Sequence, residues 1–168
     1  MRSFIGWVGG KKLLAKTIVP LLPPHTCYVE AFGGAAWVLF AKDRSKVEVY
    51  NDLDRRLVEL FRTVKYHPDA LVRELEYLVP SREMFELFKA QPGITEIQRA
   101  ARFYYVLKLS FSRLCETFGY GKTPGSGASG VDVHKLKADL QRVQERLSSV
   151  RVEHCDFAQM LERFDGRD

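Results

Sequence analysis

The chain has 168 residues, which fits one domain or a domain with a modest insertion, and is too short for a two-domain enzyme. Hydrophobic residues make up 46% and charged residues 28%, a composition that excludes disordered, collagen-like and low-complexity proteins. Apolar runs are far shorter than the roughly 20 residues that span a bilayer, and residues 1–4 lack a secretory signal. We therefore expect a cytoplasmic protein without a membrane partner.

The net charge is +5, and its distribution is uneven. Residues 1–29 and residues 99–122 each carry a net charge of +4. Clustered positive charge favours a phosphate or nucleic-acid partner, while a solvated basic face is the alternative. The three cysteines are far apart and form no C-x-x-C pair, so we expect neither a disulfide framework nor a metal site.

Two units of a strand, a loop and a helix are predicted in the first 65 residues. β-branched and aromatic residues indicate the strands, Gly33-Gly34 and Asn51-Asp52 mark the loops, and apolar spacing indicates the helices. The predicted elements are a glycine-rich turn over 4–11 that opens a short helix to 19, a strand over 27–32 with a helix over 35–41, and a strand over 46–50 with a helix whose apolar positions lie between 57 and 64.

Helical periodicity without strands follows residue 66, and a strand pattern returns at 150–153. The predicted helices cover 68–78, 81–90, 95–114, 132–147 and a last short segment from the Asp156 cap to 164, with a glycine-rich loop over 119–130. The order predicts an α/β fold with two β-loop-α units in 1–65, a mainly helical insert in 66–148 and a third unit in 149–168.

Glycines and an acid follow the first two predicted strands at the positions where parallel sheets bind ligands. Gly33 and Gly34 would let a ligand approach the backbone, and Asp52 would hold a ribose hydroxyl. Taken singly, a Gly-Gly pair also makes a turn and an Asn-Asp pair also caps a helix. The sequence has no G-x-G-x-x-G fingerprint to seat a dinucleotide, so a nucleoside such as S-adenosylmethionine fits better.

Three ordered motifs, in residues 4–11, 28–35 and 50–54, resemble the Dam-type adenine-specific DNA methyltransferase family. The resemblance implies a partial Rossmann-like S-adenosylmethionine-dependent core with an inserted DNA-recognition domain. It implies methyl transfer from that cofactor to the exocyclic amino group of adenine in double-stranded DNA, as in restriction-modification, in bacterial or phage cytoplasm near the nucleoid. We expect a monomer. The implied cofactor residues are Trp7, Gly10, Lys11, Phe32, Gly33, Gly34, Asp52, Asp156 and Phe157.

The insert resembles the family's DNA-recognition region over residues 101–107, and Ser112-Arg113 replace its Asn-Gly pair. Aromatic residues between basic ones are typical of proteins that stack on bases and hold phosphates. A core helix with a solvated basic face is the alternative for Tyr104 and Tyr105. The replaced pair leaves the target sequence open. The expected DNA-binding residues are Arg102, Tyr105, Lys108, Ser112, Arg113 and Lys122.

These methyltransferases act through an Asp-Pro-Pro-Tyr loop, and no such tetrapeptide occurs in the sequence. We therefore predict no catalytic residue and expect an N-terminal portion that is inactive alone. A non-catalytic DNA-binding module is one alternative. A P-loop NTPase, suggested by Gly121-Lys122-Thr123, is disfavoured because Glu116 replaces its first glycine and Pro124 prevents a following helix.

Overall fold

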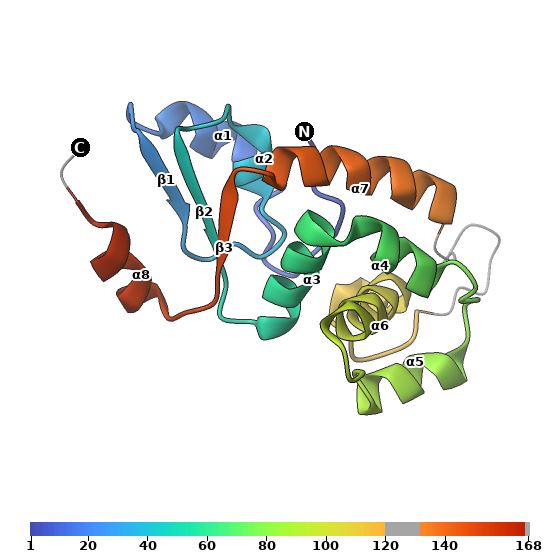
Figure 1. Cartoon of the computed structure of the whole chain (residues 1–168). Helices are drawn as coiled ribbons and strands as arrows, with labels where there is room; N and C mark the ends of the chain where they lie inside the picture. Colours follow the sequence, from blue (N-terminus) through green and yellow to red (C-terminus); the bar gives the residue numbers. More distant parts are fainter. Residues whose placement is uncertain (120–131, 167–168) are drawn as a thin grey trace.

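Three parallel strands form the sheet of this computed structural model, which describes residues 1–119 and 132–166. The strands are β1 (Cys27–Glu30), β2 (Val47–Asn51) and β3 (Val150–Glu153), in the order β1-β2-β3. Glu30 lies opposite Tyr50, and Tyr50 lies opposite Val152. Because β3 pairs with β2 after a long helical excursion, the chain leaves the sheet and returns to it (Figure 1).

The first helices follow the strands as the sequence predicts. Asp54 caps α3 by accepting a hydrogen bond from the Arg56 amide at 2.9 Å, because an Asp side chain can satisfy the free amides of a first turn. The glycine-rich turn opens only one helical turn, which continues as a 3-10 turn. These helices are α1 (Ala15–Ile18), the 3-10 turn (Val19–Leu21), α2 (Trp37–Ala41) and α3 (Arg55–Tyr66).

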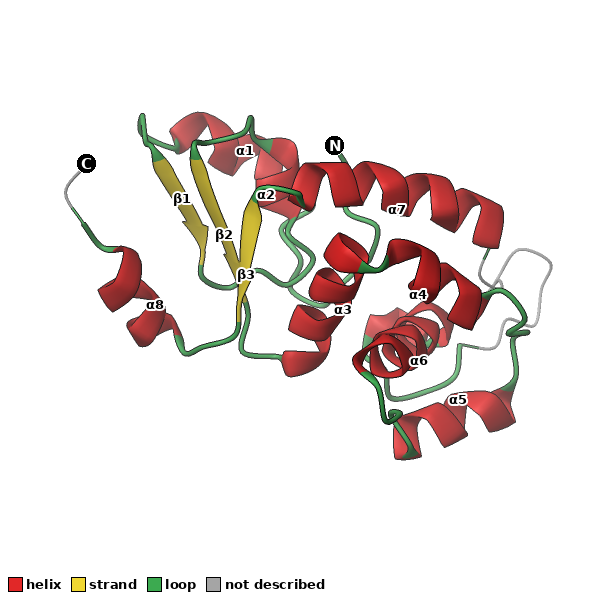
Figure 2. Ribbon diagram, viewed as in Figure 1, coloured by secondary structure: helices red, strands yellow, loops and turns green. Residues whose placement is uncertain are grey.

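Helices fill most of the described part of the excursion, which also contains an isolated antiparallel bridge between Ser110 and Phe118, and one more helix follows β3. They are α4 (Pro68–Leu75), α5 (Arg82–Ala90), α6 (Glu96–Leu109), α7 (Val133–Leu147) and α8 (Phe157–Phe164). Figure 2 shows α4 to α7 together on one side of the sheet and α8 on the other. Among the described residues, no helix is both long and apolar enough to cross a membrane.

The predicted helix over 95–114 is too long, because α6 ends at Leu109. Ser110 is extended, and the chain reverses so that the Gly119 amide donates to the Leu109 carbonyl at 2.7 Å. The Phe111 amide donates to the Thr117 carbonyl at 2.8 Å in the same reversal. The backbone there is paired across a hairpin, so it cannot continue the helical ladder.

One hydrophobic cluster runs from the sheet side into the helical segment. It contains Tyr50 of β2, Phe61 of α3 and Tyr105 of α6, each no more than 1% exposed. α6 packs against α3, α4 and α5, so it is buried on several sides. The domain boundaries at 65/66 and 148/149 stay predictions, and the two parts share this apolar core.

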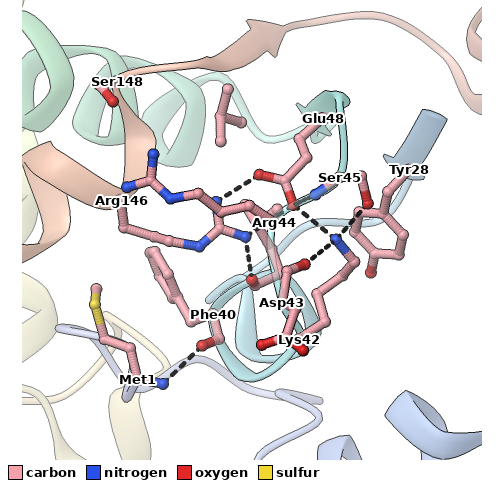
Figure 3. Close-up of polar contacts among 12 residues, drawn as sticks. Met1, Tyr28, Phe40, Lys42, Asp43, Arg44, Ser45, Glu48, Arg146 and Ser148 are labelled. Atoms are coloured by element: carbon pink, nitrogen blue, oxygen red, sulfur yellow. Dashed lines mark hydrogen bonds and ion pairs between the residues drawn. The ribbon is translucent and has the colours of Figure 1, made fainter. Parts of the chain in front are cut away.

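A buried group of charged residues joins α7 to the sheet (Figure 3). Arg146 contacts both oxygens of the Glu48 carboxylate at 2.5 and 2.9 Å, and Lys42 Nζ lies 2.7 Å from the same carboxylate. Arg146 also donates to the Leu39 carbonyl at 2.7 Å. Burial alone would raise the pKa of Glu48, but hydrogen bonds from Arg146 and Lys42 hold it below its ordinary value. The end of α7 is thus fixed to β2.

Candidate functional site

A cavity of about 180 Å³ lies where the N-terminal loop meets the loops that follow β1 and β2. Parallel strands place their carboxyl ends at one edge of a sheet, so these loops converge. Seven of the nine residues predicted to bind the cofactor line it. The lining residues are Trp7, Val8, Gly9, Gly10, Lys11, Glu30, Phe32, Gly33, Gly34, Ala35, Trp37 and Asp52.

Hydrogen bonds join the two strand-end loops. The Gly33 amide donates to the Asn51 carbonyl at 2.8 Å, and the Tyr50 hydroxyl donates to the Gly34 carbonyl at 2.9 Å. A Cβ on Gly33 would overlap the Tyr50 ring, and Gly34 has a φ of +50°, a backbone region that favours glycine. The glycine pair is therefore required for the close approach of the loops that shape the cavity.

Asp52 is held in place by the backbone of both loops. Its Oδ2 accepts the Gly34 amide at 2.7 Å, and its Oδ1 accepts the Asp54 amide at 2.8 Å. An ionised carboxylate has about four acceptor positions, so two remain after these bonds. Asp52 can therefore accept a hydroxyl from a ligand without giving up the bonds that orient it.

The N-terminal loop forms the opposite wall. Lys11 Nζ donates to the Phe32 carbonyl at 3.2 Å and, as far as residues 1–119 and 132–166 are concerned, keeps two further N–H donors. The Trp7 ring meets the Phe103 ring of α6 edge-on, with centroids 5.9 Å apart. A Cβ on Gly34 would lie 3.2 Å from Trp7 Cδ1, so this indole lies directly over the glycine loop. Trp7 thus separates the cavity from the helical segment.

Glu30 is a cavity residue that the sequence analysis missed. Its Oε2 accepts the Leu39 amide at 2.8 Å and the Tyr28 hydroxyl at 3.2 Å, whereas its buried Oε1 has no hydrogen-bond partner among the described residues. Burial raises the pKa of Glu30 to about 7, against the opposing effects of the Leu39 amide and Lys11. Its position at the end of β1, three residues before Gly33, is the sequence feature from which its place in the cavity could have been predicted.

The lining chemistry fits S-adenosylmethionine on two grounds. The buried, unpartnered Oε1 of Glu30 and the free acceptor positions of Asp52 suit ammonium and hydroxyl groups. The free donors of Lys11 suit a carboxylate. One cavity thus offers acceptors and a cation, the combination that a zwitterionic amino acid joined to a ribose requires.

The other two predicted cofactor residues do not line the cavity. Asp156 caps α8 by accepting the Ala158 amide at 2.9 Å. The Phe157 ring is 47% exposed and lies 5.5 Å from the ring of Phe32, which does line the cavity. Phe157 is therefore adjacent to the site through Phe32, whereas Asp156 has a capping role in this structure.

Tyr105 was expected to contact DNA, and its position corrects that expectation. The residue is 1% exposed, and its hydroxyl donates to the Val79 carbonyl at 2.7 Å and accepts the Ser81 amide at 3.0 Å. Tyr104 is 3% exposed, and burial raises the pKa of its hydroxyl. Neither ring can stack on a base in this structure, because the helices around α6 cover both.

The other predicted DNA-binding side chains have mixed surroundings. Arg102 lies over the Phe88 ring at 5.0 Å and donates to the Gln91 carbonyl at 2.6 Å. Lys108 is half-buried, and burial together with the nearby Arg113 lowers its pKa. Lys122 lies outside the described residues.

Ser112 and Arg113 are exposed at the turn that follows α6. Their φ values of +53° and +59° are in the left-handed region, which Asn and Gly adopt more readily than Ser or Arg. The Arg113 side chain passes over Gly6, where an added Cβ would clash with it. Ser112 and Arg113 therefore form a turn for which Asn and Gly would be better suited.

No group of three or more His, Cys, Asp and Glu side chains that could hold a metal ion occurs within residues 1–119 and 132–166. His25 contacts the Pro23 carbonyl at 2.6 Å and the Ser45 hydroxyl at 2.9 Å. His154 contacts the Leu53 carbonyl at 3.1 Å. These contacts give the two histidines positions in the hydrogen-bond network of the loops.

Residues 7–168 match the sequence profile of a family described as D12 class N6 adenine-specific DNA methyltransferase. The DNA adenine methylase of Escherichia coli K12 is 31% identical over 120 residues, which cover 68% of this chain and 43% of that protein. The Type II methyltransferase M1.LlaDCHI of Lactococcus lactis subsp. cremoris is 29% identical over 124 residues, with the same coverage. The DNA adenine methylase of Vibrio cholerae is 27% identical over 130 residues, 74% of this chain and 46% of that protein.

The chain spans less than half the length of these curated relatives. Its match to the family profile nonetheless extends over nearly all of its residues, from the N-terminal loop through α8. The protein belongs to the D12 class N6 adenine-specific DNA methyltransferase family.

Proposed function

We propose that the protein transfers a methyl group from S-adenosylmethionine to the exocyclic amino group of adenine in DNA, and that the described residues hold the cofactor. The observation that carries this proposal is the convergence of Trp7, Lys11, Gly34 and Asp52 on one cavity at the carboxyl ends of β1 and β2. These residues come from three separate loops, so their convergence is a property of the fold. The family and the names of the relatives support the same reaction.

Each wall of the cavity has a distinct role in the proposal. Lys11 binds the methionine carboxylate, Asp52 accepts the ribose hydroxyls, and Glu30 faces the ammonium group. Trp7 and Phe32 cover the apolar parts and exclude water. The cofactor, when bound, supplies a methyl group attached to a positively charged sulfur.

Activation of the adenine requires a group that the described residues do not identify. Methyl transfer needs the lone pair of the amino nitrogen aimed at the methyl carbon, and such positioning supplies about 7–11 kcal/mol of the barrier. The sequence contains no Asp-Pro-Pro-Tyr segment. The expectation that residues 1–168 alone do not methylate DNA stays a prediction, which a tritium-transfer assay on adenine-containing duplex checks.

DNA is the proposed partner of the exposed basic residues around the end of α6. Arg113 lies close enough to Lys108 to contribute, after burial, to the lowered pKa of that ammonium group, and Arg113 also reaches the cofactor loop at Gly6. A duplex bound to this surface would lie beside the cavity that holds the cofactor. Arg102, six residues before Lys108 on α6, lies toward α5 over the Phe88 ring and is a further basic group of this helix.

Calorimetric titration with S-adenosylmethionine tests the cofactor proposal. Replacing Asp52 with Ala should weaken binding by about 1–3 kcal/mol, the scale of losing a charge-assisted hydrogen bond. Asp54→Ala is the matched control, because Asp54 is a carboxylate of the same loop that does not line the cavity. Equal affinities of Asp52→Ala and wild type would refute the assigned role.

Thermal unfolding of the wild type with cofactor and, separately, with duplex DNA distinguishes the two functions that the sequence left open. A ligand that binds the folded state alone raises the melting temperature. An increase with both ligands supports the methyltransferase proposal. An increase with DNA and none with S-adenosylmethionine would instead indicate a non-catalytic DNA-binding module.

A further inference from the structure

A second cavity, of about 230 Å³, lies among α3, α5 and α6. It shares no lining residue with the cofactor cavity. The Phe103 ring lines it, and the edge-on contact between Phe103 and Trp7 separates the two cavities. Its lining residues are Arg56, Glu59, Phe88, Lys89, Pro92, Arg99, Phe103, Val106 and Cys115.

Aromatic and aliphatic side chains form much of its wall. Phe88 and Phe103 are 9% and 8% exposed, and Val106 is 4% exposed. The Arg56 guanidinium lies 5.2 Å from the Phe103 ring centroid, and the Arg102 guanidinium lies 5.0 Å from that of Phe88. Guanidinium groups beside aromatic rings are the surfaces on which proteins stack unpaired bases.

Cations on its rim keep unused hydrogen-bond donors. Arg56 uses two of its five N–H groups in a bidentate pair with Asp54, at 3.0 and 2.7 Å. Arg99 uses two with Glu59, both at 2.9 Å, and one with the Ile94 carbonyl. With respect to the described residues, three donors of Arg56 and two of Arg99 therefore remain for a ligand.

The carboxylates around the cavity do not cancel its positive charge. Three carboxylates, those of Asp54, Glu59 and Glu86, pair with the rim cations. Within the part of the chain that the structure describes, five cations line the cavity or contact its lining residues, which leaves an excess of two positive charges. The five cations are Arg55, Arg56, Lys89, Arg99 and Arg102.

We propose that this cavity binds one nucleotide, with its base against Phe88 and Phe103 and its phosphate at Arg56, Lys89 and Arg99. Ligand cavities for drug-sized molecules are about 300–1,000 Å³, so this smaller one has room for one ring system rather than a dinucleotide. Phe88 and Phe103 are each more than nine-tenths buried, so a base that stays paired in a duplex cannot reach them, and the bound nucleotide is one that has left the base stack. The identification of the nucleotide as part of the DNA rests on the proposed function.

Cys115 provides a reporter for this cavity, because it lines the wall whereas Cys27 and Cys155 do not. Alkylation of each thiol by iodoacetamide is followed by peptide mass spectrometry at pH 8.5, which favours the thiolate of Cys115, whose pKa burial raises. The probes are deoxyadenosine monophosphate, inorganic phosphate, S-adenosylmethionine, a paired duplex and a duplex with one bulged adenine.

Deoxyadenosine monophosphate should slow alkylation of Cys115 at least about fivefold and leave Cys27 and Cys155 unchanged, because a bound base covers the wall. The bulged duplex should protect Cys115 more strongly than the paired one. Lack of protection by the mononucleotide, equal slowing of all three thiols, or equal protection by inorganic phosphate would overturn the proposal. Equal protection by both duplexes would overturn the assignment to an unstacked nucleotide.

Charge variants provide an independent test. Arg56→Ala combined with Lys89→Ala should raise the nucleotide concentration for half-protection about tenfold, because two phosphate-binding cations are lost. Lys46→Ala with Lys137→Ala, a pair of exposed cations outside the cavity, should leave it unchanged. S-adenosylmethionine should not protect Cys115, and Asp52→Ala should not alter protection by the nucleotide, so failure of the cofactor proposal is separable from failure of this one.

Discussion

The cofactor cavity and helix α6 differ in how well the sequence predicts where their side chains lie. Most residues predicted for the cavity line it, from loops that are far apart in the chain. On α6, the aromatic side chains expected to contact DNA are buried and Tyr105 is hydrogen-bonded in the core. Loops that follow parallel strands all lie at one edge of the sheet, so their residues can be placed from the sequence. A helix that is covered on several sides has no single apolar face, so its sequence does not show which side chains are exposed.

The two regions are nonetheless joined by direct side-chain contacts. Arg146, at the end of the helical segment, is paired with Glu48 of β2, and Trp7 of the cofactor loop meets Phe103 of α6. The second cavity is lined by residues of both α3 and α6, whereas the cofactor cavity meets the helical segment through the contact between Trp7 and Phe103.

Breaking the buried ion pair tests whether the helical segment and the sheet unfold as one unit. Arg146→Met should lower the free energy of unfolding by about 3–5 kcal/mol, because Glu48 is left buried with one cation fewer. Urea denaturation should show one transition. Arg142→Met is the matched control on the same helix, and its exposed pair with Asp139 should contribute less than about 1 kcal/mol. Equal effects of the two changes would contradict the account.

Glu30 makes the cofactor region sensitive to pH. Its folded pKa of about 7 exceeds its ordinary value of 4.5, so the folded state binds the proton more tightly than the unfolded chain. This carboxyl therefore reduces the free energy of unfolding as the pH rises from about 4.5 to 7. The free energy of unfolding of Glu30→Gln, relative to that of wild type, should therefore increase by roughly 2–3 kcal/mol when the pH is raised from 5 to 8. Urea denaturation at both pH values measures it, and a pH-independent difference would contradict the assignment.

DNA affinity tests the basic surface of the helical region. Binding should weaken with salt, with a log–log slope of about −0.9 per phosphate contacted. Replacing Arg102, Lys108 and Arg113 with Ala should flatten that slope. Replacing three cations of the sheet side, Lys46, Arg151 and Arg163, should leave it nearly unchanged. Fluorescence anisotropy with a labelled duplex measures both slopes, and an unchanged slope in the first variant would mean that its cations form a solvated face.

The smallest effect concerns the strained turn between the two regions. Arg113→Gly removes the backbone strain of a left-handed conformation, about 1–2 kcal/mol, which Arg113→Ala keeps. Glycine also raises the entropy of the unfolded chain, which costs about 0.5–1 kcal/mol. The Gly variant should therefore be slightly more stable than the Ala variant. Both changes remove the same contact with Gly6. Thermal unfolding of the two variants isolates the backbone contribution, and a Gly variant less stable than the Ala variant would contradict it.

Sequence patterns predicted the order of elements and the strand-end loops because each depends on local spacing and turn residues. The end of α6 was placed too late because the apolar pattern continues to Leu114, whereas the backbone pairs across a hairpin from Leu109 to Gly119. The burial of Tyr105 depends on contacts with α5 and its preceding loop, which no local pattern encodes. Glu30 was missed because its burial is visible only once α2 lies across the end of β1.

Tryptophan fluorescence reports on cofactor binding at this site, because the two tryptophans of the chain, Trp7 and Trp37, both line the cofactor cavity. Titration of residues 1–168 with S-adenosylmethionine should change the emission along a saturable curve, shifted to higher concentration about 5- to 150-fold in Asp52→Ala. Asp54→Ala should give the wild-type curve. Emission that does not respond to the cofactor while calorimetry detects binding, or curves that coincide for all three proteins, would show that the cofactor binds elsewhere.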